Sequence, residues 1–127
     1  MTAQRHADYL EHMLQAANDA RTFVDGLHQC EFVADKRTQQ AVILNLLIIG
    51  EAASKLLQNH STFLAQHPEL PWTSMKGMRN RLAHGYFDID LDVVWDTLHE
   101  ALPELQERLP EIIAHALQES RESGPAS

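Results

Sequence analysis

The stretch from Met78 to Tyr86 concentrates side chains that can hold a phosphate and move protons. It reads MRNRLAHGY and contains two guanidinium groups, an amide, an imidazole and a phenol. An imidazole transfers protons near neutral pH, and a guanidinium binds phosphate oxygens through paired N–H donors. The set suits RNA cleavage by the adjacent 2′-hydroxyl, which needs a base, an acid and positive charge on the phosphorane. As residue types alone, an Arg–His pair on a helix is more often a surface cluster.

The spacing within this stretch limits how one helix could present it. Asn80 and His84 are four residues apart, so they share a helix face and can form a hydrogen bond. Arg79 and His84 are five residues apart, and an ideal helix directs them roughly 140° apart. We therefore expect either that the turn at Gly85 reorients His84 or that a second copy of the segment completes the site.

Segments with helical periodicity must position these residues, and none of them alternates with the period of a strand. They cover residues 2–27, 33–58, 73–84 and 88–117. The pattern predicts an all-α, up-and-down four-helix bundle with a short third helix that carries the motif. We expect one helical domain over 1–118, a polar connection over 59–71 and a disordered tail over 119–127.

Two of these segments have unusual features. The second is apolar around so much of its circumference that we place it centrally in the bundle, or at a subunit interface as well as in the core. Its longest apolar run, 41–49, is far shorter than the roughly 20 residues of a membrane span, so we expect no membrane association. In the fourth segment, Pro103 predicts a bend near His99, because the proline ring crowds that carbonyl.

The net charge is unevenly distributed along the chain. Ten Lys and Arg residues against 18 Asp and Glu residues give −8, which argues against broad coating of nucleic acid or of an anionic membrane. The segment from Asp88 onward carries the whole excess, whereas 70–87 has no acid and contains Lys76, Arg79 and Arg81. The charge therefore leaves room for a narrow basic site, in which Lys76 and Arg81 are phosphate contacts or simply solvated groups.

The cysteine and histidine content argues against a metal site. The single cysteine, Cys30, excludes an internal disulfide and a cysteine-based zinc site, and it suits a cytoplasmic location. A di-iron bundle needs Glu-x-x-His on two helices, and only the weaker pair Asp96 and His99 is present. We expect no metal or other cofactor. We also expect the five histidines that precede the motif at the surface: His6, His12, His28, His60 and His67.

Glu51 continues the apolar stripe of the second helix and so is expected to point toward the protein. One interpretation is an ion pair with Lys55 or the capping of a neighbouring helix end. The other is a carboxylate that orients Arg79 or His84.

These residues resemble a known family. The pattern Arg79-x4-His84-x-Tyr86 is similar to the R-x4-H-x-Y signature of the HepT-like toxins, in the HEPN superfamily of helical ribonucleases, and Asn80 fits the polar position after the arginine. The segment ILNLLIIGEAASKL resembles the second-helix signature of that family. The resemblance extends from about Tyr9 to Leu109.

The resemblance implies a toxin of a type II HEPN/MNT toxin–antitoxin system. Such a toxin is a metal-independent endoribonuclease, and it forms a homodimer whose two motif helices meet in a cleft. Arg79 and His84 would be catalytic, with Asn80 and Glu51 supporting them. The cognate partner would be an MNT-type nucleotidyltransferase that transfers AMP to Tyr86, where an anionic adduct near His84 would block the cleft.

A different class of function also fits the residues. The chain could be a non-catalytic helical binding module that docks a nucleotidyltransferase partner through its basic segment. RNA cleavage by the purified protein separates the two hypotheses.

Overall fold

The computed structural model describes residues 2–123, and the side chains of residues 6–122, as helices and short connections without a strand among them. The long helical runs are α1 (Thr2–Phe23), α3 (Lys36–Asn59), α5 (Trp72–His84) and the run of α6 (Leu91–Asp96), η2 (Thr97–Ala101) and α7 (Leu102–Ser123). Short helices lie between them: α2 (Gln29–Val33), α4 (Ser61–Ala65) and η1 (Tyr86–Asp88). The predicted all-α bundle is confirmed.

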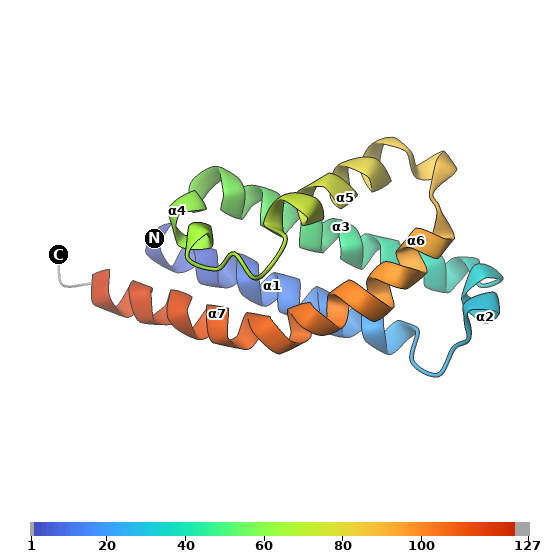
Figure 1. Cartoon of the computed structure of the whole chain (residues 1–127), viewed down its shortest axis with the longest axis horizontal. Helices are drawn as coiled ribbons and strands as arrows, with labels where there is room; N and C mark the ends of the chain where they lie inside the picture. Colours follow the sequence, from blue (N-terminus) through green and yellow to red (C-terminus); the bar gives the residue numbers. More distant parts are fainter. Residues whose placement is uncertain (1, 124–127) are drawn as a thin grey trace.

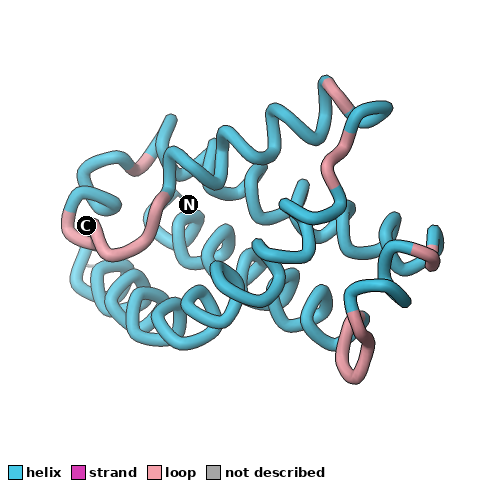
Figure 2. The backbone as a smooth tube through the Cα atoms, turned by 45° about the vertical axis from the view of Figure 1, so that its right-hand side comes forward, coloured by secondary structure: helices cyan, strands magenta, loops and turns pink. Residues whose placement is uncertain are grey.

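The helices pack in the order α5, α3, α1 and α7. α1 contacts both α3 and α7, whereas α5 packs mainly on α3. Figure 1 shows this order, with α5 on one side of the α1–α3 pair and the α6–α7 run on the other, and Figure 2 shows the same arrangement from a second direction. α5 is therefore an edge helix, and only α3 holds most of its length.

The core lies where α1, α3 and α7 meet. Side chains that recur at helical spacing are fully buried there, as their apolar periodicity predicts; they include Leu10, Met13, Val42, Leu56, Leu109 and Ile112. By length and composition, α3 could also cross a membrane. In this fold it is instead the helix on which α1 and α5 pack.

Several helix boundaries differ from the predicted ones because local caps set them. α3 begins at Lys36 rather than at 33–34, since the Asp35 carboxylate accepts hydrogen bonds from the Thr38 N–H at 3.1 Å and the Thr38 hydroxyl at 2.6 Å. These bonds lower the pKa of Asp35. α1 ends at Phe23, and Gly26 adopts a φ of +79° in the turn that follows, a conformation natural to glycine.

The two predicted non-helical segments also contain helix. α4 occupies part of the expected connection 59–71, where Phe63 and Leu64 are buried and stabilise a short turn of helix. At the other end of the chain, α7 continues past residue 118 to Ser123, so 119–123 are helical rather than disordered. The rest of the predicted tail, 124–127, lies outside the described residues.

The predicted irregularity at Pro103 takes the form of a π-helical turn. The Leu102 N–H donates to the Thr97 carbonyl, five residues back, and Pro103 has no N–H to offer next. Figure 1 shows that the run changes direction between α6 and α7. The bend predicted near His99 is confirmed, and it arises from a single π-helical turn.

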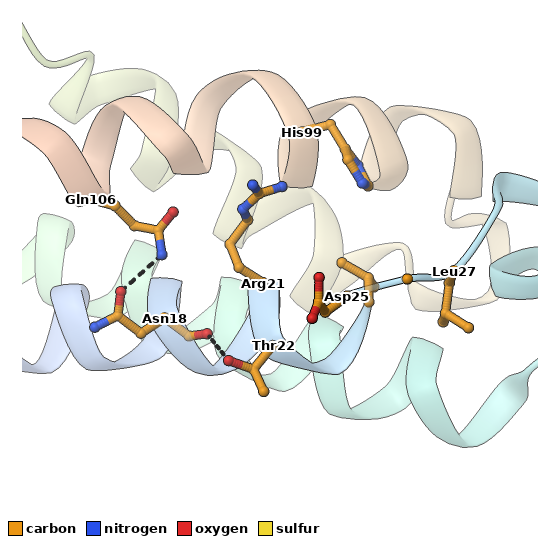
Figure 3. Close-up of a pocket in the computed structure, with 9 residues that line it drawn as sticks. Asn18, Arg21, Thr22, Asp25, Leu27, His99 and Gln106 are labelled. Carbon is orange, nitrogen blue, oxygen red and sulfur yellow. Dashed lines mark hydrogen bonds between the residues drawn. The ribbon is translucent and has the colours of Figure 1, made fainter.

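The π turn leaves the Leu98 carbonyl without its usual backbone donor, and Arg21 replaces that donor. Arg21 Nη1 donates to the Leu98 carbonyl oxygen at 3.2 Å. Figure 3 shows Arg21 reaching from α1 beside His99, in a polar hollow of about 540 Å³. In the same hollow Gln106 donates to Asn18 at 2.9 Å. These bonds attach α1 to the bent run.

A cluster of imidazole rings packs around Phe63 at one end of the bundle. The His6 ring stacks on His60 with centroids 5.0 Å apart and meets the Phe63 ring edge-on at 4.7 Å. His6 is 3% exposed, so its predicted surface position is wrong. His6 lies four residues before Leu10 and therefore on the core face of α1. There its imidazole ring packs against the rings of His60 and Phe63. His60 and His67 are half-buried rather than exposed.

The same cluster holds the segment that leads into α5. His67 Nε2 and His115 Nδ1 share a hydrogen bond of 2.7 Å, which joins this segment to α7. The Trp72 indole N–H donates to the His67 carbonyl at 2.9 Å. The start of α5 is therefore anchored through Trp72, which is itself buried.

We predict that the Arg21→Met substitution lowers the free energy of unfolding by about 1 kcal/mol, because the Leu98 carbonyl loses its donor. In a Pro103→Ala background the cost should be smaller, since the alanine introduced at position 103 supplies an N–H within reach of that carbonyl. Chemical denaturation of the four proteins in this cycle measures the difference. Equal costs in both backgrounds would contradict the role of Arg21.

Candidate active site

The candidate site forms where α5 crosses α3, and a glycine sets how closely the two helices approach. A Cβ atom built on Gly50 of α3 would lie 2.2 Å from the Arg79 Cβ and 2.8 Å from the Met75 carbonyl oxygen. Neither distance is compatible with van der Waals contact. Only glycine at position 50 therefore allows α5 to lie this close to α3, and Arg79 is the residue at the point of contact.

Arg79 is held by the residue that follows this glycine. Its Nε and Nη2 atoms both donate to Oε1 of Glu51, at 3.0 and 2.5 Å, and its Nη1 donates to the side-chain oxygen of Asn80 at 2.7 Å. The Arg79 side chain is 28% exposed and that of Glu51 49%. Because the pair is partly solvated, it adds little to stability. Its main effect is to orient the guanidinium, two of whose five N–H donors remain available.

Of the two interpretations of Glu51, the structure therefore favours the carboxylate that orients Arg79. Asn80 also contacts Arg79, rather than forming the predicted hydrogen bond with His84. Within the described part of the chain, the His84 side chain forms no hydrogen bond or ion pair, and it is exposed. The imidazole is therefore accessible to a ligand.

Arg79 and His84 line the same shallow surface hollow despite their spacing of five residues. The hollow, called the motif hollow below, is lined by Leu47, Ile48, Glu51, Arg79, Ala83 and His84. His84 keeps its place as the last residue of α5, and the chain turns only afterwards, with the Gly85 N–H donating to the Arg81 carbonyl at 2.9 Å. A single chain thus presents both side chains on one side of α5.

The other predicted site residues lie outside the motif hollow. Arg81 is two positions from Arg79 and lines hollows on the opposite edge of α5, with Met78. Lys76 is exposed and does not line the motif hollow. Tyr86 follows α5 in the turn η1 and is 62% exposed, so its hydroxyl is accessible.

The part of the chain that contains this site matches a known family. A family model described as "Ribonuclease HepT-like" matches residues 13–112, a range that includes all residues of the motif hollow. The chain belongs to the HepT-like ribonuclease family. The predicted resemblance is therefore confirmed.

Individual relatives of this HepT-like chain carry consistent names. A probable ribonuclease HepT from Thermococcus cleftensis is 44% identical over 101 residues, which cover 80% of this chain and 89% of the relative. Proteins named "Putative RNase" from Caldanaerobacter subterraneus and Methanocaldococcus jannaschii are 35% and 34% identical over 105 residues. These matches cover 83% of this chain, and 91% and 84% of the two relatives. No solved structure matches the chain significantly.

The sequence interpretation missed the apolar part of the site. Leu47, Ile48 and Ala83 line the motif hollow, and Leu44, one turn before Ile48, is 59% exposed. The sequence does contain a signal for this apolar surface. Apolar residues surround more of the second helix than the burial of a single face requires. That pattern shows that some apolar residues stay outside the core, but the packing of α1 and α5 decides which ones.

No metal-binding arrangement accompanies the site. Among the described residues, no group of three or more His, Cys, Asp or Glu side chains is arranged to hold a metal ion. His99 is engaged with the Trp95 carbonyl at 2.9 Å and with the Trp95 ring, rather than with Asp96. The polar hollow beside Arg21 contains none of the predicted site residues.

We predict that the Gly50→Ala substitution lowers the free energy of unfolding by about 1–3 kcal/mol, because the methyl group forces α3 and α5 apart. Gly77→Ala is the matched control, since a Cβ there meets only Arg81 Nη1 at 3.6 Å. It should stabilise α5 by about 0.5–1 kcal/mol. Chemical denaturation compares the two, and equal effects would show that the close approach is not a constraint.

Proposed function

We propose that this HepT-like chain is the toxin of a type II HEPN/MNT toxin–antitoxin pair and cleaves RNA as an endoribonuclease without a metal ion. The observation that carries the proposal is the motif hollow, where Glu51 orients the Arg79 guanidinium beside an exposed His84. The family membership supports ribonuclease activity.

The proposed reaction uses a nucleophile that the substrate itself carries. The 2′-oxygen of a ribose forms a bond to the adjacent phosphorus, the bond from phosphorus to the 5′-oxygen breaks, and the products are a cyclic 2′,3′-phosphate and a 5′-hydroxyl. A base takes the proton of the 2′-hydroxyl, and an acid protonates the leaving oxygen. The free N–H donors of Arg79 stabilise the charge on the phosphorane. No step requires a metal to generate the nucleophile.

A homodimer would supply two imidazoles to one substrate, one as the base and one as the acid. Support for it comes from the exposed apolar side chains beside the motif hollow, Leu44 at 59% and Ile48 at 37%. Exposed leucine and isoleucine side chains next to each other favour burial against another surface. In the proposed dimer the two α5 helices face one another across a cleft, and Asn80 helps to hold Arg79.

The position of Arg81 narrows the set of RNA contacts in this proposal. Because Arg81 lies on the opposite edge of α5, it would contact the strand only away from the scissile phosphate. Lys76 is exposed but does not line the motif hollow, so it too would contact the strand outside the hollow. Both then add to affinity rather than to the chemical step.

The exposed free thiol of Cys30 supports the proposal that the protein acts in the reducing cytoplasm.

We predict that His84→Ala reduces RNA cleavage by about 10²- to 10⁴-fold, the usual contribution of a general acid–base. Because the side chain is exposed, the free energy of unfolding should not change. His12→Ala, which removes an exposed histidine from α1, is the control and should cleave at the wild-type rate. Cleavage is measured with purified protein and a labelled RNA in the presence of EDTA. Wild-type cleavage by His84→Ala would refute the catalytic assignment and favour the binding module.

A separate prediction concerns regulation by the proposed nucleotidyltransferase antitoxin. The Tyr86 phenolic oxygen would attack the α-phosphorus of ATP, so that pyrophosphate leaves and the phenolic proton is released. The intact mass should then rise by AMP units and cleavage should fall, because the adduct brings negative charge close to His84. Tyr86→Phe should block the mass increase. An adduct of the same size on that variant would show that the modification occurs elsewhere.

A further inference from the structure

Phe87 is the most exposed of the large apolar side chains for which exposure is described. It is 86% exposed, whereas most other phenylalanines and tryptophans of the chain are buried or half-buried. A phenylalanine in water gives up the free energy that burial would contribute. Folding of this chain therefore does not account for an aromatic side chain at this position.

The Phe87 ring does not stand alone. It stacks on the Tyr86 ring, with centroids 4.3 Å apart and planes 28° from parallel. The turn η1 holds the pair, because the Asp88 N–H donates to the Gly85 carbonyl at 2.9 Å. Two stacked rings in a hydrogen-bonded turn form a flat aromatic surface whose orientation relative to α5 is set by the backbone.

This surface begins two residues after His84, with only Gly85 between them. Gly85 is not helical, with φ −126° and ψ 35°, so the three residues from His84 to Phe87 span at most about 10 Å, a distance of the order of one or two nucleotide steps along a strand. A phosphate contacted by His84 therefore has its neighbouring base close to the two aromatic rings.

The charges around the rings also suit an anionic strand on the α5 side. The segment 70–87 contains no acid, and two of the next three acids along the chain accept hydrogen bonds. The Asp90 carboxylate accepts from the N–H groups of Asp92 and Val93 as the cap of α6, and Asp92 accepts from Gln29. Neutral donors leave these carboxylates negatively charged, so Asp88, Asp90 and Asp92 together favour a path for the strand on the side toward Arg79.

We propose that Phe87, stacked on Tyr86, is a platform for one base of a single-stranded RNA, next to the phosphate that His84 contacts. The inference rests on the proposed ribonuclease function and specifies its substrate class. Bases are available for stacking on side chains in single strands, loops and bulges but not inside a duplex. Stacking on an aromatic face is tolerant of base identity, so the platform positions the strand without selecting its sequence.

The test uses a short single-stranded 2′-O-methyl oligonucleotide that carries a fluorescent 2-aminopurine base. Its blocked 2′-oxygens cannot attack phosphorus, so binding is measured without cleavage. We expect Phe87→Ala to weaken binding by roughly 5- to 100-fold, the usual loss when one base stack is removed. Fluorescence quenching of the 2-aminopurine should decrease with it.

Two further variants separate a base platform from a general apolar contact. Phe87→Trp keeps an aromatic face and should bind close to the wild-type affinity. Phe87→Leu keeps apolar volume without that face and should lose affinity as the alanine variant does. Full binding by either the leucine or the alanine variant would overturn the platform.

Two more measurements distinguish the remaining outcomes. Sedimentation of the variants should show the wild-type oligomeric state, and a loss of oligomer with Phe87→Ala would assign Phe87 to an interface between copies instead. Wild-type protein is tested in parallel for cleavage of unmodified RNA. If it cleaves while Phe87→Ala binds normally, only the platform fails; if it neither binds nor cleaves RNA, the proposed ribonuclease function fails as well.

Discussion

The close approach of α3 and α5 at Gly50 is the constraint on which the candidate active site depends. A side chain at this position would overlap the Arg79 Cβ and separate the helices. Without the approach, Glu51 could not reach the guanidinium at 2.5–3.0 Å, and Arg79 would keep only its hydrogen bond to the neighbouring Asn80. Because residue 50 has no side chain, α3 and α5 approach closely enough for Glu51 to orient the Arg79 guanidinium.

The remainder of the fold supports this contact from a distance. α5 packs mainly on α3, so its position also depends on Trp72, whose indole binds the His67 carbonyl in the segment that His115 ties to α7. On the other side of the bundle, the π turn before Pro103 and its contact with Arg21 fit the last helical run onto α1. An edge helix anchored at its start leaves its last residue, His84, and Tyr86 in the turn that follows open to solvent.

Local sequence signals accounted for the helices but not for all of their boundaries. Periodicity predicted the four long runs, and Pro103 predicted the irregularity near His99. The cap at Asp35 and the short helix α4 were missed because each depends on only a few contacts. His6 was misplaced because a polar residue at a core position is acceptable only when partners such as His60 and Phe63 surround it.

The sequence by itself determined the family, the all-helical architecture and the residues able to do chemistry, because periodicity and the motif Arg79-x4-His84-x-Tyr86 are local properties of the chain. Only the tertiary structure decided which of those residues meet. Arg79 and His84 line one hollow, and Arg81 lies on the other edge of α5. Glu51 forms its ion pair with Arg79 rather than with Lys55. The physical reason is that these relations depend on how closely and at what rotation two helices pack, and that packing is set by contacts between residues far apart in the chain.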